Sequence, residues 1–174
     1  MLSCVEASVI IASAGIRQVG MGVLLGLADW RLETPALAEH IHCVIKKHWK
    51  IYLSVSFSRI RPAYKVDTGN FKYLVSDKNL VQMIVAMRLC FADVALVLST
   101  REPAYLRDNL ITIGITKMSA GSKTSPGDYA QRENRTENQF DVNGSRSVKE
   151  VAEMVKKHGF EPIWKDWDST FTGI

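Results

Sequence analysis

The chain has 174 residues, of which 47% are hydrophobic and 23% are charged, a composition typical of a folded domain that buries a core. Its formal charge of +4 comes from scattered Lys and Arg without interleaved aromatic residues, which argues against nucleic-acid binding. No apolar stretch is long enough to span a membrane, and the first residues lack the basic start of a secretory signal. We therefore expect a cytoplasmic protein with no membrane contact.

The three cysteines, Cys4, Cys43 and Cys90, are odd in number and far apart. This pattern suits a reducing compartment and does not indicate a disulfide framework. Their spacing matches no zinc or iron-sulfur motif, so we expect no metal ligand in this chain.

The predicted elements begin after an apolar stretch, residues 1–13, that has no clear turn signal and that we interpret as an irregular or truncated start. Residues 14–174 are expected to form one domain. Four short apolar runs follow, and each ends in polar residues: residues 19–26, 51–57, 95–98 and 111–118. Continuous apolar runs are typical of parallel strands buried on both faces.

A helix is predicted after each of these runs. Thr34-Pro35 is expected to begin the first, Ser76-Asp77 the second and Glu102-Pro103 the third. Ser147 and Glu150 have the spacing of a capping box at the start of the fourth. Alternating strands and helices predict an α/β fold of about four βα units. Such a fold is either a small doubly wound domain or half of an eight-stranded barrel, because a complete barrel needs about 250 residues.

Five motifs together resemble those of one enzyme family. They are GMGVLLGL at residues 20–27, SFSRIRPA at 56–63, LSTRE at 98–102, MSAGS at 118–122 and WKDWD at 164–168. In this combination they are similar to the C-terminal half of thiamine-pathway tyrosine lyases, also called 2-iminoacetate synthases. These are radical S-adenosylmethionine enzymes, and the matching region is the biotin and thiamin synthesis associated domain.

The resemblance implies a fold, a reaction and cofactors. The fold would be the C-terminal half of a TIM-like (βα)8 barrel, incomplete by itself. The complete enzyme would use S-adenosylmethionine and a 4Fe-4S cluster to cleave the Cα-Cβ bond of tyrosine. The products would be p-cresol and 2-iminoacetate, which is used for the thiazole of thiamine. The implied partners are tyrosine, the missing N-terminal half-barrel and the thiazole synthase machinery.

Two departures from the family pattern bear on activity. The cluster-binding motif C-x3-C-x2-C is absent from the sequence, so we expect the chain to be inactive alone. Asp128 stands where the family usually has glycine, which puts the path of that loop in question.

The cofactor-binding residues implied by the resemblance are Gly22, Leu24 and Gly26. Residues 22–29 are similar to the family element that packs against the adenine of S-adenosylmethionine. Glycines at a strand end allow a backbone to approach a flat ligand closely. The alternative is a tight strand-to-helix turn that needs a positive φ.

The predicted substrate-binding residues are Arg101, Ser119, Ser122 and Arg61. A guanidinium at a strand end can hold the carboxylate of an amino acid bidentately, and Ser119 and Ser122 can hydrogen-bond to the same carboxylate or to the amine. The alternative is a buried Arg101 that pairs with Glu102 or with another acid for structure. Arg59 and Arg61 are expected to point to opposite faces, one lining the barrel and the other meeting solvent. No residue of this chain is predicted to be catalytic in itself.

Three other functions remain open. The tyrosine lyase of hydrogenase maturation is the closest rival, although its family carries a cysteine-bearing C-terminal extension. The chain is alternatively a non-catalytic fragment or split subunit that acts by binding its missing half, with strand edges that favour association. A phosphate-binding aldolase-like barrel would need a lysine at a strand end, for which Lys117 is the candidate.

Overall fold

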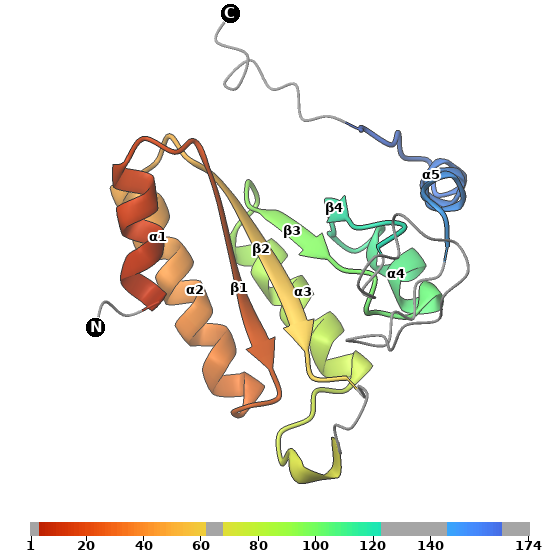
Figure 1. Ribbon diagram of the computed structural model, residues 1–174, viewed down its shortest axis with the longest axis horizontal. Helices are drawn as coiled ribbons and strands as arrows, with labels where there is room; N and C mark the ends of the chain where they lie inside the picture. The colour runs from red at the N-terminus through yellow and green to blue at the C-terminus, as the bar shows by residue number, and fades with distance from the viewer. Residues whose placement is uncertain (1–3, 62–67, 123–145, 165–174) are drawn as a thin grey trace, which may run out of the picture.

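Four parallel strands in the order β1-β2-β3-β4 form the centre of the molecule in a computed structural model, which describes residues 4–61, 68–122 and 146–164 (Figure 1). The α/β class and the parallel βα arrangement predicted from the sequence are confirmed. The elements are α1 (Cys4–Ser13), β1 (Gln18–Leu25), α2 (Trp30–Lys47), β2 (Tyr52–Arg59), the 3-10 turn η1 (Thr68–Asn70), α3 (Asp77–Cys90), β3 (Ala95–Leu98), α4 (Ala104–Leu110), β4 (Lys117–Met118) and α5 (Val148–Lys157).

Side-chain caps fix where the helices begin. The hydroxyl of Ser76 accepts a hydrogen bond from the backbone N–H of Asn79 at the start of α3. The predicted capping box of α5 is confirmed, because Ser147 and Glu150 each accept a bond from the other's backbone N–H. The structure describes residues Cys4–Ser13 as a helix rather than irregular chain, and this helix contacts β1 and α2.

The predicted start of α2 at Thr34-Pro35 was wrong. The helix begins at Trp30, and the carboxylate of Asp29 caps it by accepting a bond from the N–H of Arg31 at 3.0 Å. Thr34 instead donates its hydroxyl to the carbonyl of Trp30 at 2.6 Å, and Pro35 lies inside the helix. A local threonine-proline signal therefore did not mark the cap, because an acidic cap earlier in the chain already satisfies the first turn.

The two faces of the sheet differ in burial. In β2 the buried residues are Leu53, Val55, Phe57 and Arg59, and half-buried serines alternate with them. β1 is in register with β2, so that Gly22 lies beside Ser56 and Leu24 beside Ser58. We call the less buried side of these two strands the open face; it carries Gly20, Gly22, Leu24, Ser54, Ser56 and Ser58. The expectation that these runs are buried on both faces was therefore wrong for β1 and β2.

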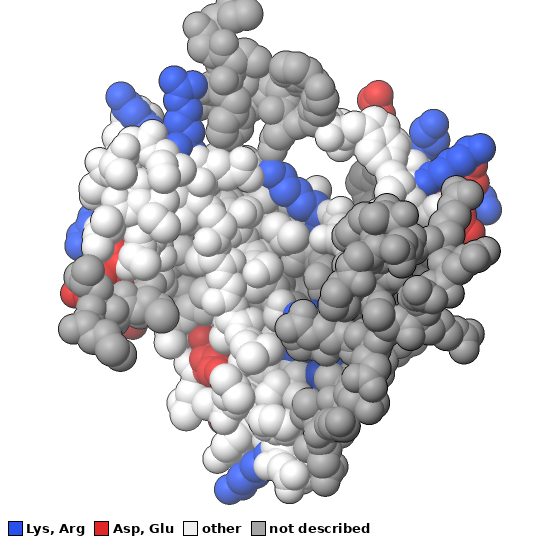
Figure 2. Space-filling model, viewed as in Figure 1, with Lys and Arg blue, Asp and Glu red and all other residues white. Residues whose placement is uncertain are grey.

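The opposite face of the sheet packs against helices and forms the core. Fully buried side chains include Ile41 of α2, Leu80 and Ile84 of α3, and Leu110 of α4, which join Phe57 of β2. Burying each such side chain contributes roughly 1.5–3 kcal/mol. In Figure 1, α3 runs behind β2, and Figure 2 shows a mostly uncharged surface over β1 and β2 in the same view.

The fourth strand is much shorter than the predicted residues 111–118. The carbonyl of Leu110 accepts bonds from the N–H groups of Ile113, Gly114 and Ile115, so this stretch turns instead of extending. Gly114 has a φ of +148°, which suits glycine. Pairing resumes where the N–H of Thr116 donates to the carbonyl of Leu96 at 3.0 Å. Among the residues described, no helix has both the length and the apolar character needed to cross a membrane.

Candidate functional site

The carboxyl ends of the four parallel strands lie at one edge of the sheet, which is where ligands bind in such folds. Arg59 ends β2, the segment from Ser99 to Glu102 follows β3, and Ser119 follows β4. The topology therefore brings together the strand-end residues that the sequence singled out.

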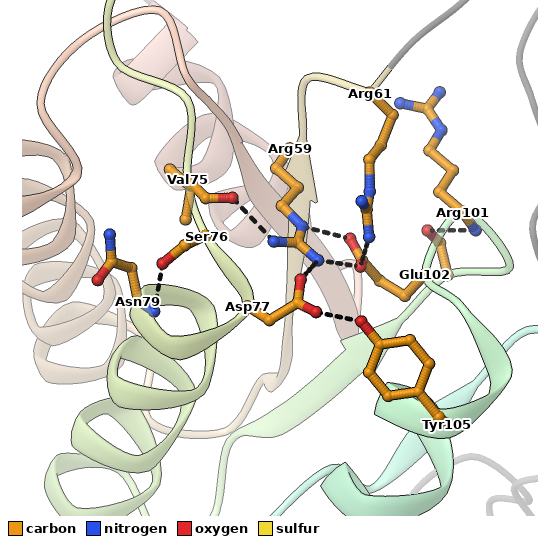
Figure 3. Close-up of polar contacts among 10 residues, drawn as sticks. Arg59, Arg61, Val75, Ser76, Asp77, Asn79, Arg101, Glu102 and Tyr105 are labelled. Atoms are coloured by element: carbon orange, nitrogen blue, oxygen red, sulfur yellow. Dashed lines mark hydrogen bonds and ion pairs between the residues drawn. The ribbon is translucent and has the colours of Figure 1, made fainter.

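A cluster of polar and charged side chains joins two strand-to-helix connections, the one from β2 to α3 and the one from β3 to α4 (Figure 3). The Glu102 carboxylate accepts bonds from Arg59 Nε at 2.9 Å, from Arg59 Nη2 at 2.5 Å and from Arg61 Nη2 at 2.6 Å. Arg59 also donates to Asp77 Oδ1 at 2.5 Å, and the hydroxyl of Tyr105 donates to the same Asp77 carboxylate. We call Arg59, Arg61, Asp77, Glu102 and Tyr105 the ion cluster.

The centre of the ion cluster is removed from water. Arg59 is 3% exposed and Glu102 is 1% exposed. Burial alone would lower the pKa of Arg59, but the hydrogen bonds and charges of Glu102 and Asp77 outweigh it and raise the pKa above its ordinary value. Arg59 Nη1 also donates to the carbonyl of Val75 at 2.8 Å, which ties the segment before α3 to the strand.

The outer part of the ion cluster is more accessible. The hydrogen bond from Tyr105, followed by the bond and charge of Arg59, holds the pKa of Asp77 below its ordinary value of 3.8. The same bond raises the pKa of the Tyr105 hydroxyl, because it stabilises the neutral donor.

The expectation that Arg59 and Arg61 point to opposite faces was wrong. Both guanidinium groups reach the carboxylate of Glu102. Residues i and i+2 of an extended strand lie on the same face, which explains why the two side chains converge. Arg61 Nη2 is thus bound to Glu102, while its buried Nε has no hydrogen-bond partner within the described part of the chain.

Arg101 lies directly beside this cluster without joining the Glu102 pair. Its backbone N–H donates to the hydroxyl of Ser99 at 3.3 Å, and in Figure 3 its guanidinium points away from the carboxylate of Glu102. The carboxylate of Glu102 is paired with Arg59 and Arg61. Arg101 is half-buried at the strand-end edge.

Both backbone groups of Ser119, its N–H and its carbonyl, make hydrogen bonds. Its N–H donates to the carbonyl of Leu98 at 3.0 Å, and Arg107 Nη2 donates to its carbonyl. Gly121 has a φ of +63°, so the chain turns between the two half-buried serines, Ser119 and Ser122. Both serines are thus at the same edge as Arg101.

The glycines predicted to bind a cofactor have structural roles as well. A Cβ on Gly22 would lie 2.3 Å from Ser56 Oγ, so glycine permits close packing of β1 on β2. Gly26 has a φ of +113°, as the alternative of a tight turn required. Gly22 and Leu24 nevertheless lie exposed on the open face, Leu24 with an exposed fraction of 45%. These two residues of the open face are therefore accessible to a ligand.

The described residues do not fit an iron-sulfur cluster. Within residues 4–61, 68–122 and 146–164, no three His, Cys, Asp or Glu side chains gather as metal ligands. Cys43 is half-buried on α2, and Cys90 is exposed at the end of α3. Asp128 and residues 165–168 of the last family motif lie outside the described residues.

The sequence did not single out Asp77, Tyr105 or Arg107 as site residues. Asp77 was recognised as part of a helix start, and Tyr105 and Arg107 belong to a short helix. Only for Arg107 was a signal available, because a charged residue there lies beside Leu106 on a predicted helix, and the structure shows it fully buried.

The chain is similar in sequence to two curated enzymes. The 2-iminoacetate synthases of Salmonella typhimurium and Escherichia coli are 42% and 40% identical to it over 159 residues, which is 90% of this chain and 41% of each relative. The chain thus spans about two fifths of the length of the curated relatives it matches.

Solved structures of FeFe-hydrogenase maturases have the same fold. A crystal structure of HydG superposes with a TM-score of 0.86 at 32% identity, covering 97% of this chain and 36% of that one. HydG from Carboxydothermus hydrogenoformans has a TM-score of 0.68 at 33% identity, covering 85% of this chain and 33% of that one. The expected partial barrel is confirmed by these similarities together with the parallel sheet.

The family model of the biotin and thiamin synthesis associated domain matches residues 56–161, which contain the second half of β2, all of β3 and β4, and the whole ion cluster. The family resemblance inferred from the sequence motifs is therefore confirmed. The chain belongs to the family of the biotin and thiamin synthesis associated domain.

Proposed function

We propose that the chain is the carboxyl-terminal part of a tyrosine lyase of the 2-iminoacetate synthase type. The observation that carries the proposal is the identity of 40–42% over 90% of the chain to two 2-iminoacetate synthases. The complete enzyme would cleave the Cα-Cβ bond of tyrosine to give 2-iminoacetate and p-cresol for thiamine thiazole synthesis. The free thiols of Cys43 and Cys90 suit the cytoplasm as its location.

In this proposal the chain supplies the anchor for the amino-acid end of tyrosine. Arg101 binds the substrate carboxylate, and Ser119 and Ser122 hydrogen-bond to the carboxylate or to the amine. Arg101 suits this role because its neighbour Glu102 is fixed by two arginines, which holds the backbone of Arg101 at the strand-end edge. Arg61 borders the same site, with its Nη2 engaged by Glu102.

Of the two cofactors of the complete enzyme, we propose that S-adenosylmethionine contacts this chain and that the iron-sulfur cluster is bound elsewhere. S-adenosylmethionine with a 4Fe-4S cluster would supply the radical chemistry that starts cleavage. Gly22 and Leu24 on the open face would contact its flat adenine, and Gly26 would shape the following turn. Since the described residues contain no group of metal ligands, the cluster would be held by the N-terminal half-barrel, which would also cover the open face. The thiazole synthase machinery is a further proposed partner.

The hydrogenase-maturation alternative has weaker support. The identity to HydG is 32–33%, lower than the identity to the 2-iminoacetate synthases.

A chimeric enzyme tests the proposal. The chain is joined to the N-terminal part of the Salmonella typhimurium relative in place of that enzyme's matching segment. The chimera is then reconstituted anaerobically with iron and sulfide, given S-adenosylmethionine, a reductant and tyrosine, and assayed for p-cresol by chromatography. We expect p-cresol from the chimera and a loss of about a hundredfold in kcat/KM for Arg101→Met, because the proposed contact between the guanidinium and the substrate carboxylate is removed.

The matched control is Arg31→Met, which removes an arginine whose side chain is 69% exposed on α2. This variant is expected to retain the activity of the chimera. A folded, iron-loaded chimera that makes no p-cresol would overturn the proposal and favour the binding-only alternative.

A further inference from the structure

Arg107 is a fully buried arginine in a helix of seven residues, α4, that lies between the two proposed substrate anchors. Arg101 precedes α4 by three positions, and Ser119 follows β4. Arg107 Nη2 donates a hydrogen bond to the carbonyl of Ser119. The side chain therefore connects the helix that follows one anchor to the backbone of the other.

Keeping an arginine at this position is costly. Its Nε and Nη1 have no hydrogen-bond partner among the residues that the structure describes, and its exposed fraction is 0%. Burial, and secondly the nearby positive charge of Arg146, lower the pKa of Arg107. An apolar side chain of similar size would fill the space without this desolvation penalty. It would lack the donor that Arg107 offers to Ser119.

The bond from Arg107 completes the fixation of Ser119. On its other side, the N–H of Ser119 donates to the carbonyl of Leu98 at 3.0 Å, and Leu98 ends β3 three positions before Arg101. Loss of either bond would leave one side of the Ser119 backbone free to shift. Small shifts of a substrate anchor have large effects on binding and rate.

We propose that Arg107 is a positioning residue that holds Ser119 in register with Arg101, so that both contact the same substrate carboxylate. This inference rests on the proposed function. It assigns to Arg107 no contact with substrate, since the side chain acts through the Ser119 carbonyl.

Arg88 provides a matched control because it makes the same kind of contact before β4. Its Nε and Nη2 donate to the carbonyl of Gly114 at 3.1 and 2.7 Å, and its Nη1 donates to the carbonyl of Val94 at 2.9 Å. Gly114 precedes β4 and Val94 precedes β3, so Arg88 fixes the end of these strands that lies away from Arg101 and Ser119. Arg88→Met should thus destabilise β3 and β4 at their amino ends without displacing Arg101 or Ser119.

The experiment compares Arg107→Met, Arg107→Lys and Arg88→Met in the chimeric enzyme. We expect Arg107→Met to raise the KM for tyrosine about tenfold, the effect of one misplaced hydrogen bond, and Arg107→Lys to raise it severalfold. Arg88→Met should lower the midpoint of urea unfolding and leave KM within about twofold. Amide hydrogen exchange should speed up at residues 118–121 in the Arg107 variants and at residues 114–116 in Arg88→Met.

The outcomes separate the two claims. If the unsubstituted chimera is folded and iron-loaded but makes no p-cresol, the proposed function fails and the inference fails with it. If that chimera is active and the Arg107 variants match Arg88→Met in KM, Arg107 is only structural and the inference alone is overturned. Arg107→Lys keeps a cation of similar length, so it serves the same comparison if Arg107→Met does not fold.

Discussion

At the scale of single residues, the buried carboxylate of Glu102 is the group on which the strand-end edge most depends. It neutralises Arg59 and also binds Arg61. Glu102→Gln would leave Arg59, at 3% exposure, with the Asp77 carboxylate as its remaining acidic partner in the ion cluster. We expect a loss of about 3 kcal/mol in the free energy of unfolding, measured by urea denaturation.

The control for this prediction is Asp108→Asn, which breaks the more exposed pair of Asp108 with Arg146 at 2.7 Å. That variant should lose about 1 kcal/mol. Equal losses in the two variants would contradict a special role for burial at Glu102.

The hydroxyl of Tyr105 tunes the acidity of Asp77. Its hydrogen bond is the largest cause of the lowered pKa of Asp77, so Tyr105→Phe should raise that pKa toward 3.8. Because the folded-state pKa is depressed, ionised Asp77 stabilises the fold above pH 3.8, and this contribution is lost as the pH falls through the folded-state value. An NMR titration of the Asp77 carboxyl in both proteins measures the change. An unchanged titration curve would show that Arg59 and Arg61, and not Tyr105, lower the pKa of Asp77.

At the scale of elements, the helices are held by one apolar side. Ile84 of α3 is completely buried against the sheet, whereas Leu89 of the same helix is 82% exposed. We expect Ile84→Ala to lower the free energy of unfolding by about 3 kcal/mol, since it leaves a cavity in the core. Leu89→Ala should change it by less than about 0.5 kcal/mol. Urea denaturation distinguishes them, and similar losses would contradict the packing described for α3.

At the scale of the whole molecule, β1 is an edge strand of the described sheet, whereas β2 is paired on both sides. Unpaired strand edges are templates for association. When the N-terminal half-barrel of a relative is added as a separate protein, we expect it to pair with β1. Amide exchange should then slow in β1 and change little in β2. Hydrogen exchange with mass spectrometry measures both strands in one experiment. Equal protection of β1 with and without the added half would argue against this mode of assembly.

Local signals in the sequence predicted much of the fold. The cap of α3 at Ser76 and the capping box of α5 depend on residues within one turn, and both were found as expected. The β4 prediction failed because the apolar character of residues 111–116 does not reveal that the Leu110 carbonyl would draw them into a turn. Placing Arg101 and Ser119 at one edge was predictable, because parallel strands align their carboxyl ends.

The sequence by itself determined the βα alternation, the helix caps of α3 and α5 and the family, since each depends on spacings within short segments. Only the tertiary structure decided that Arg59 and Arg61 both bind Glu102 and that Arg107 donates a hydrogen bond to the carbonyl of Ser119. Arg59 and Glu102 are 43 positions apart, and the choice among several acidic partners is made by how neighbouring strands and helices pack. Burial then makes that choice energetically decisive, because a charge removed from water must find its partner within the fold.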